Sequence, residues 1–106
     1  MKTFFKNPNF ELYNENTFDV LDKLIKEKKK FNCIFADPPY FLSNDGITCV
    51  NGKMVKVNKG DWDKSKGIEQ NFQYNYDWLS RCKELLSDNG TIWVSGTFHI
   101  IYAVAF

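Results

Sequence analysis

Four consecutive residues, Asp37-Pro38-Pro39-Tyr40, have the types and spacing for chemistry on a planar amine. Proline fixes φ and has no backbone N–H, so this turn presents carbonyl groups as rigid acceptors. The Asp37 carboxylate adds a further acceptor, and Tyr40 adds a flat ring. An NH₂ group with two protons to donate, such as the exocyclic amine of a base, fits this set. Taken by itself, the tetrapeptide could also be a plain Pro-Pro turn with an exposed aspartate.

Two apolar runs predict the strands that position this tetrapeptide. Residues 31–36 (FNCIFA) are almost continuously apolar, which is typical of a strand buried on both faces of a parallel sheet. Residues 91–96 (TIWVSG) are apolar and β-branched, and we expect Trp93 in the core. Ligands bind at the carboxyl edge of open α/β sheets. Because Asp37 directly follows the first run, we expect it at that edge.

Two helices and a third strand complete the predicted pattern. Residues 10–13 (FELY) predict the strand, and a helix follows the candidate caps Asn16 and Thr17. Its apolar residues at helical spacing are Phe18, Leu21, Leu24 and Ile25. Residues 76–90 predict the second helix, which Asn89-Gly90 would end. The apolar face of this helix carries Trp78, Leu79, Cys82, Leu85 and Leu86.

The order strand, helix, strand, long loop, helix, strand predicts an α/β protein with a parallel sheet and right-handed crossovers. The chain has 106 residues, enough for one small domain, and its apolar fraction of 43% allows a core. A net charge of +1 argues against a basic surface over the whole chain, but not against a local one. No segment resembles a signal peptide or a membrane span.

Two further features carry alternative interpretations. Residues 26–30 (KEKKK) would form a solvated helix end whose cations suit the helix dipole, or a phosphate-binding patch. The cysteines Cys33, Cys49 and Cys82 are widely spaced and odd in number, so we expect reduced thiols. They would need His99 to complete a zinc site, and no close pair of ligands supports one. We therefore expect no metal.

Several blocks beyond the tetrapeptide resemble, in their order, the bacterial adenine-N6 DNA methyltransferases. These blocks are "LYNENTFDVL", "FADPPYFLSNDG", "KGDWD" and "W…LL…NGTIWVSGTFH", and the resemblance covers about residues 10–104. It is strongest to the GATC-type, DpnA-like enzymes of the permuted β-class. The resemblance implies a Rossmann-like fold, S-adenosylmethionine as the methyl donor, DNA as the partner and the bacterial cytoplasm as the location.

The resemblance also implies a mechanism for the tetrapeptide. The target adenine would be flipped out of the duplex, and Tyr40 would stack on it. The Asp37 carboxylate and the Pro38 carbonyl would accept hydrogen bonds from the N6 amine, while Pro39 keeps the turn rigid. The methyl group would then transfer in line, with no covalent enzyme intermediate, so positioning and electrostatics would carry the catalysis.

Roles outside the tetrapeptide follow from the same resemblance. Asn16 stands where the family usually has a cofactor-binding aspartate, and Asn16 and Asp37 are the expected cofactor-binding residues. Trp62 would lie over the DNA or anchor its loop. Lys59 and Lys64 would contact phosphates or remain solvated.

The sequence further predicts an incomplete enzyme. The family's glycine-rich "FxGxG"-like cofactor segment does not occur in the 106 residues, three of about seven strands are found, and residues 100–106 form an apolar run. We expect residues 1–106 to be the N-terminal part of one methyltransferase catalytic domain, with a long loop at about 41–70. The recognition region and the glycine-rich segment would be missing, and the chain alone would be inactive and poorly stable.

Two alternatives to this function stay open. An aspartate in the first position of the tetrapeptide is typical of the adenine enzymes in this family, but cytosine-N4 DNA methylation is the nearest alternative. The other is a non-catalytic, DNA-binding half of a split enzyme, which would pair with a complementary polypeptide that carries the glycine-rich segment.

Overall fold

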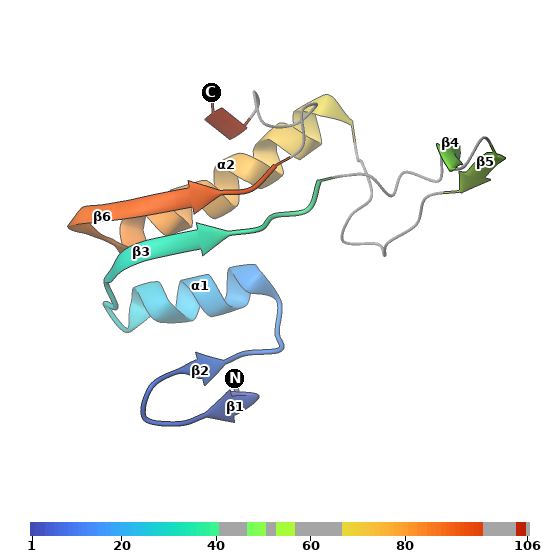
Figure 1. The fold of residues 1–106 in the computed structure, drawn as a ribbon. Coiled ribbons are helices and arrows are strands. Elements are labelled where there is room, and N and C mark those ends of the chain that lie inside the picture. The colour runs from blue at the N-terminus through green and yellow to red at the C-terminus, as the bar shows by residue number, and fades with distance from the viewer. Residues whose placement is uncertain (41–46, 51–52, 57–66, 97–103, 106) are drawn as a thin grey trace.

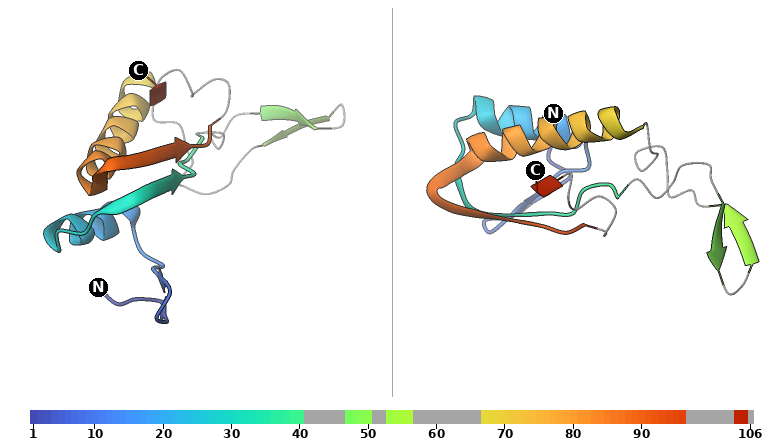
Figure 2. Two further views of the ribbon diagram at one scale, coloured as in Figure 1. Left: turned by 60° about the vertical axis from the view of Figure 1, so that its left-hand side comes forward. Right: turned by 90° about the horizontal axis from the view of Figure 1, so that it is seen from above.

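The fold is described from a computed structural model, in which residues 1–40, 47–50, 53–56, 67–96 and 104–105 are described. Its centre is a parallel strand pair packed against two helices (Figure 1). The strands are β3 (Phe31–Ala36) and β6 (Leu86–Val94), and the helices are α1 (Thr17–Lys26) and α2 (Ile68–Leu85). Figure 2 shows both helices on the same side of the strand pair. The predicted α/β class is confirmed in this form.

The register of β3 and β6 decides which residues meet at the edge of the sheet. Ile34 pairs with Ile92, and the last pair of the ladder is Ala36 with Val94. Both strands run in the same direction, so the residues that follow them leave the sheet side by side. The predicted strand at 31–36 is confirmed, and it delivers Asp37 to the carboxyl edge of the strand pair.

The core lies between α2 and the inner face of the sheet. Asn75, Trp78, Cys82 and Leu85 recur at helical spacing along α2 and are buried, with Leu85 only 1% exposed. The buried polar atoms are paired, because the Trp78 indole N–H donates to Asn75 Oδ1 at 3.0 Å. The predicted apolar face of this helix is confirmed at Trp78, Cys82 and Leu85.

Helix α1 packs on α2 through an aromatic and ionic contact. The rings of Phe18 and Tyr74 meet edge to face, with centroids 5.3 Å apart. The Arg81 guanidinium lies 4.8 Å from the centroid of the Phe18 ring, and its Nε donates to Asp22 at 2.7 Å. The predicted apolar residues of α1, Phe18 among them, are half-buried. The two helices therefore form one layer.

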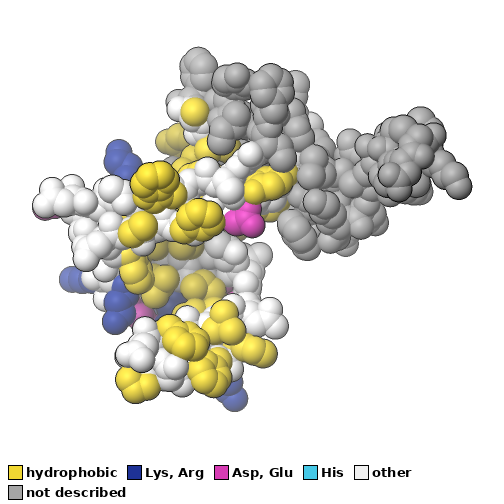
Figure 3. All heavy atoms as spheres, in the orientation of Figure 1, with side chains coloured by type: hydrophobic (Ala, Val, Ile, Leu, Met, Phe, Trp, Pro, Cys, Tyr) yellow, Lys and Arg dark blue, Asp and Glu magenta, His cyan; other side chains and the backbone are white. Residues whose placement is uncertain are grey.

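The outer face of the strand pair is open among the described residues. Phe35 and Trp93 are paired across the two strands and are 74% and 64% exposed. Figure 3 shows hydrophobic side chains gathered over β3 and β6 on this face. The predictions of a strand buried on both faces and of a core Trp93 are therefore wrong for this part of the chain. Both described helices cover the opposite face, so alternate residues point away from them.

The predicted end of the second helix is also wrong. Helix α2 stops at Leu85, and the chain passes directly into β6, so Asn89-Gly90 lies inside the strand segment. A Cβ atom at Gly90 would lie 3.0 Å from the Ser87 carbonyl oxygen and 3.1 Å from that of Phe31. Glycine is needed here because two backbones approach closely, and not because a helix ends.

The first predicted strand pairs outside the parallel sheet. It is β2 (Glu11–Leu12), which forms an antiparallel pair with β1 (Phe5–Lys6). Asn7 closes this hairpin, since its Oδ1 accepts hydrogen bonds from the backbone N–H groups of Asn9 and Phe10 at 2.8 and 2.9 Å. The predicted order, with this strand in the parallel sheet, is therefore wrong in the described structure.

The predicted loop at 41–70 contains regular structure. β4 (Ile47–Val50) and β5 (Lys53–Lys56) form an antiparallel pair, and α2 begins at Ile68. Periodicity missed the pair because each strand has only four residues. No helix in the described ranges is long and apolar enough to cross a membrane.

The basic segment 26–30 includes a contact with a helix end. Lys30 Nζ donates to the Glu84 carbonyl oxygen at 2.6 Å, in the last turn of α2. A cation is favourable there because the carbonyl end of a helix carries partial negative charge. Lys30 therefore contacts the end of α2, and not the end of α1 for which the sequence predicted these cations. The choice between a solvated helix end and a phosphate-binding patch stays open for the segment as a whole.

Candidate active site

The carboxyl edge of the strand pair brings together Asp37 and Ser95. Each residue directly follows the last paired position of its strand, Ala36 in β3 and Val94 in β6. The Ser95 hydroxyl donates to Asp37 Oδ1 at 2.6 Å, and the Ser95 backbone N–H donates to the Ala36 carbonyl at 3.0 Å. The second bond continues the ladder by one step, so the backbone of Ser95 is held by β3.

Tyr40 closes a triangle of oxygen atoms with these two residues. Its hydroxyl lies 2.5 Å from Asp37 Oδ1 and 2.7 Å from Ser95 Oγ. The turn through Pro38 and Pro39, whose φ angles are fixed, brings the Tyr40 hydroxyl back to the strand ends. The sequence predicted Asp37 and Tyr40 as neighbours in one site, and the structure brings them together.

Hydrogen bonding shifts the pKa values of Asp37 and Tyr40 in opposite directions. The hydroxyls of Ser95 and then Tyr40 hold the pKa of Asp37 below the usual range of an aspartate, against a smaller opposing effect of burial. The bond to Asp37 also raises the pKa of Tyr40, since losing the phenolic proton would leave two anions together. The site therefore presents an ionised carboxylate beside a neutral phenol.

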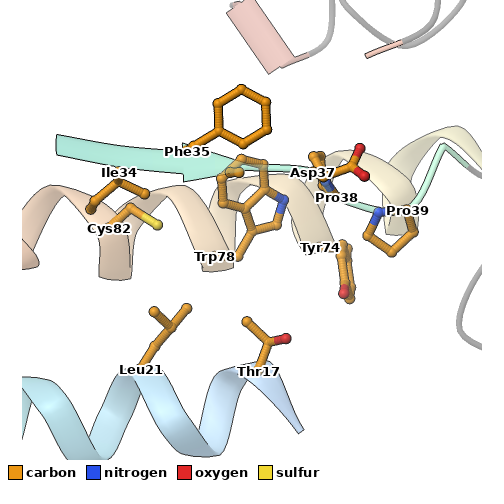
Figure 4. Close-up of a pocket in the computed structure, with 11 residues that line it drawn as sticks. Thr17, Leu21, Ile34, Phe35, Asp37, Pro38, Pro39, Tyr74, Trp78 and Cys82 are labelled. Carbon is orange, nitrogen blue, oxygen red and sulfur yellow. The ribbon is translucent and has the colours of Figure 1, made fainter. Parts of the chain in front are cut away.

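A cavity of about 260 Å³ lies beside this carboxylate, between α1, β3 and α2 (Figure 4). Its walls are mainly aliphatic and aromatic. The lining residues are Thr17, Leu21, Ile34, Phe35, Ala36, Asp37, Pro38, Pro39, Tyr74, Trp78 and Cys82. Burial raises the pKa of the Tyr74 phenol and of the Cys82 thiol, so both groups are neutral near pH 7. The cavity can hold an apolar or flat group whose polar end faces Asp37.

Pro38 and Pro39 serve this cavity as wall residues and are half-buried. Asn16 has a local partner, because its Oδ1 accepts a hydrogen bond from the Phe18 backbone N–H at 2.9 Å and begins α1. The next residue, Thr17, lines the cavity. The candidate helix cap at Asn16 is confirmed, and its cofactor-binding role stays a prediction.

The predicted DNA-binding residues of the loop, Lys59, Trp62 and Lys64, lie outside the described residues, as does His99. Within the described ranges, no three His, Cys, Asp or Glu side chains gather in a metal-binding group. Cys33 is exposed and Cys82 is buried, and both are free thiols.

Ser95 is the site residue that sequence reasoning missed. It was placed in the strand segment 91–96 and given no role of its own. The signal that would have found it is its position, because it follows β6 as Asp37 follows β3. In a parallel pair, two residues at equivalent strand ends meet at one edge.

This arrangement, with a carboxylate and a Pro-Pro turn at the edge of a parallel strand pair, can orient an amine. A model of the DNA methylase family matches residues 31–106, and the chain belongs to that family. It is 42% identical to the Type II methyltransferase M2.MboI of Moraxella bovis over 106 residues. It is 44% identical to M2.DpnII of Streptococcus pneumoniae over 103 residues, and 33% identical to M.HinfI of Haemophilus influenzae over 106.

The matches with the Moraxella and Streptococcus enzymes cover almost the whole chain, 98% and 97%. They cover 38% of each of those two relatives, and the Haemophilus match covers 30% of that enzyme. The chain therefore spans well under half the length of the curated relatives that it matches.

Proposed function

We propose that this chain carries the amine-binding half of the active site of a DNA adenine-N6 methyltransferase, on part of a Rossmann-like domain. The proposal rests on the hydrogen bonds of the Asp37 carboxylate. Its Oδ1 accepts two hydroxyl groups, while Oδ2 has no hydrogen-bond partner among the described residues. An ionised carboxylate whose Oδ1 is hydrogen-bonded and whose Oδ2 has no partner in the described part of the chain suits an amine that donates a hydrogen bond to it.

The proposed reaction uses this open oxygen. An adenine flipped out of the duplex enters the edge of the sheet, and one N6 proton is donated to Asp37 Oδ2. The second N6 proton is donated to the Pro38 carbonyl oxygen. Both bonds direct the nitrogen lone pair away from the carboxylate and toward the methyl donor. The N6 nitrogen would bond to the methyl carbon as the donor's sulfur–methyl bond breaks, the thioether would leave, and the methylated nitrogen would lose one proton to solvent. No covalent intermediate with the chain is needed, because the amine itself is the nucleophile.

The described residues fit part of a site for S-adenosylmethionine. When bound, this group supplies a methyl on a positively charged sulfur, which the ionised Asp37 would attract. Thr17, Asp37 and the Tyr74 hydroxyl are polar groups on an otherwise mainly apolar wall. The cavity of about 260 Å³ is below the usual size of a cofactor pocket, roughly 300–1,000 Å³. We infer that the described chain forms one wall of the pocket and that other residues complete it.

The exposed face of the strand pair also indicates that other residues complete the structure. Phe35 and Trp93 expose large apolar surfaces there, and such surfaces are usually covered in a working protein. The relatives are much longer than the matched segment. We therefore propose that a complementary polypeptide or segment covers this face and supplies the rest of the cofactor pocket. Loop residues Lys59, Trp62 and Lys64 would contact the DNA.

The test is reconstitution. The chain is co-expressed with the segment of the Moraxella bovis relative that lies outside the matched region, and the assembled pair is isolated by size-exclusion chromatography. We call this pair the reconstituted enzyme. It is incubated with tritiated S-adenosylmethionine and unmethylated DNA. We expect tritium in the DNA from the reconstituted enzyme, and none from either part alone.

Two results would count against the proposal. An assembled pair that transfers no methyl group would contradict the enzymatic function. Failure of the two parts to assemble would contradict the idea of a complementary segment, and would favour a chain that acts without one.

A further inference from the structure

We propose that Ser95 is a positioning residue for Asp37, whose hydroxyl holds Oδ1 and so turns Oδ2 toward the amine. The role in orienting an amine rests on the proposed function. The hydrogen bond from Ser95 to Asp37 is part of the described structure. Ser95 does not contact the substrate in this proposal. It acts through the carboxylate alone, from the neighbouring strand.

The number of protons in the triangle supports an ionised and oriented carboxylate. Asp37 Oδ1, Tyr40 Oη and Ser95 Oγ lie within 2.5–2.7 Å of one another, which makes three contacts. The two hydroxyls supply one proton each. When Asp37 is ionised, both protons can point to Oδ1, and its side chain is held from two directions. A proton on Asp37 would compete with these donors.

The backbone of Ser95 makes it the firmer of the two donors. Its N–H bonds to the Ala36 carbonyl at 3.0 Å, directly before Asp37, so donor and acceptor are attached to one ladder. Its side chain has a single carbon and a short reach. Tyr40 comes from the turn beyond two prolines, and the family resemblance implies that its ring stacks on the flipped base. Ser95 can therefore hold Asp37 even while Tyr40 rearranges.

A second cross-strand serine provides a matched control. Ser87, at the start of β6, donates to Asn32 Oδ1 in β3 at 2.9 Å, at the opposite edge of the same strand pair. Ser87→Ala removes one hydrogen bond between the two strands. Ser95→Ala removes the bond to Asp37, and with it the contacts of Ser95 Oγ with Tyr40 Oη at 2.7 Å and with the Ala36 carbonyl oxygen at 3.4 Å. Only the Ser95 bond involves a carboxylate. The two variants therefore separate an effect on Asp37 from a general effect on the sheet.

The experiment measures the pKa of Asp37 directly. The chain is labelled with ¹³C-aspartate, and the Cγ chemical shift is followed by NMR from acid to neutral pH, with Asp37→Asn to assign the signal. We expect a wild-type value below the usual range of an aspartate. Ser95→Ala should shift it upward, Tyr40→Phe should shift it upward by less, and Ser95→Thr should restore it. Ser87→Ala should leave it unchanged.

A titration of Asp37 that is the same in Ser95→Ala as in Ser87→Ala would overturn the inference, as would a larger shift in Tyr40→Phe. Folding is checked by the indole N–H signal of Trp78, which is bonded in the core. If Ser95→Ala loses that signal, Ser95→Cys replaces it, since a thiol is a weak donor and should give the same upward shift. Methyl transfer is not measured, so failure of the proposed function leaves this result intact.

Discussion

Each edge of the β3–β6 pair has a hydrogen bond from a serine of β6, or directly after it, to a polar side chain of β3, or directly after it, but the two acceptors differ. At the carboxyl edge, Ser95 donates to Asp37 at 2.6 Å, and at the amino edge Ser87 donates to Asn32 at 2.9 Å. Both contacts join a serine of one strand to a polar side chain of the other. At the amino edge the acceptor is a neutral amide. At the carboxyl edge it is a carboxylate, and there the hydrogen bond lowers the pKa of the acceptor as well as joining the two strands.

The groups around the two edges also differ: those at the amino edge stabilise a helix end, and those at the carboxyl edge form the candidate site. The amino edge is where α2 ends, and Lys30 donates to the Glu84 carbonyl there at 2.6 Å, which stabilises the helix end. The carboxyl edge has the Pro-Pro turn, the Tyr40 ring and the cavity. The two serines therefore differ in their acceptors, because Asp37 is charged and lines the cavity whereas Asn32 is neutral and lies away from it.

The largest expected effect comes from replacing the carboxylate. Asp37→Asn in the reconstituted enzyme should lower the initial rate of tritium transfer to DNA by about 10²–10³-fold, the usual cost of one lost electrostatic contact to a reacting group. The matched change at the other edge, Asn32→Asp, should leave the rate within about twofold, because that edge does not reach the cavity. Equal losses of rate in both variants would contradict the claim that only the carboxyl edge takes part in methyl transfer.

A smaller effect is expected from the stacking ring. Tyr40→Ala should weaken binding of DNA with a mismatched, easily flipped adenine by about 1–3 kcal/mol, measured by fluorescence anisotropy. Tyr40→Phe should keep the affinity because it keeps the ring. Tyr76→Ala, which removes an exposed ring from α2, serves as the control. Loss of affinity in Tyr40→Phe equal to that in Tyr40→Ala would mean that the hydroxyl, and not the ring, binds the base.

At the amino edge we expect an effect on stability alone. Gly90→Ala should lower the free energy of unfolding by about 1–3 kcal/mol, because its Cβ would crowd the carbonyl oxygens of Ser87 and Phe31. Urea denaturation followed by tryptophan fluorescence measures this change, with the exposed neighbour Asn89→Ala as the control. The Asp37 titration should not move. A shifted Asp37 pKa in Gly90→Ala would show that the two edges are coupled.

The smallest expected effect is the pH dependence of stability at the carboxyl edge. The folded-state pKa of Asp37 is lowered, so its contribution to stability is present above the unfolded pKa of about 3.9. It is lost as the pH falls through the lower folded value. Asp37→Asn should remove this part of the acid destabilisation in urea titrations below about pH 4. Ser87→Ala should keep the wild-type pH dependence, and a flat profile in Ser87→Ala would contradict the comparison.

The sequence predicted well what depends on local patterns. The strand at 31–36 and the helical spacing that begins at Phe18 are confirmed, because each is set by neighbours within a few residues. The position of Asp37 followed from the end of that strand. What it could not predict was which faces the helices cover. Phe35 and Trp93 belong to apolar runs, yet they lie on the face away from both described helices.

The role of Ser95 depends on a contact that is remote in sequence. It meets Asp37 across 58 positions, through the register of two parallel strands. No local pattern specifies that register. The error at Asn89-Gly90 has a similar origin, because Gly90 is required by its approach to Phe31, a residue of the partner strand.

The most direct test of the central claim is the identity of the methylated base. DNA labelled by the reconstituted enzyme is digested to nucleosides, and the tritium is located by chromatography. We predict that the label lies in N6-methyladenine and that its initial rate of incorporation falls by about 10²–10³-fold in Asp37→Asn. Label in N4-methylcytosine, or label in N6-methyladenine that persists at the wild-type rate in Asp37→Asn, would contradict the account.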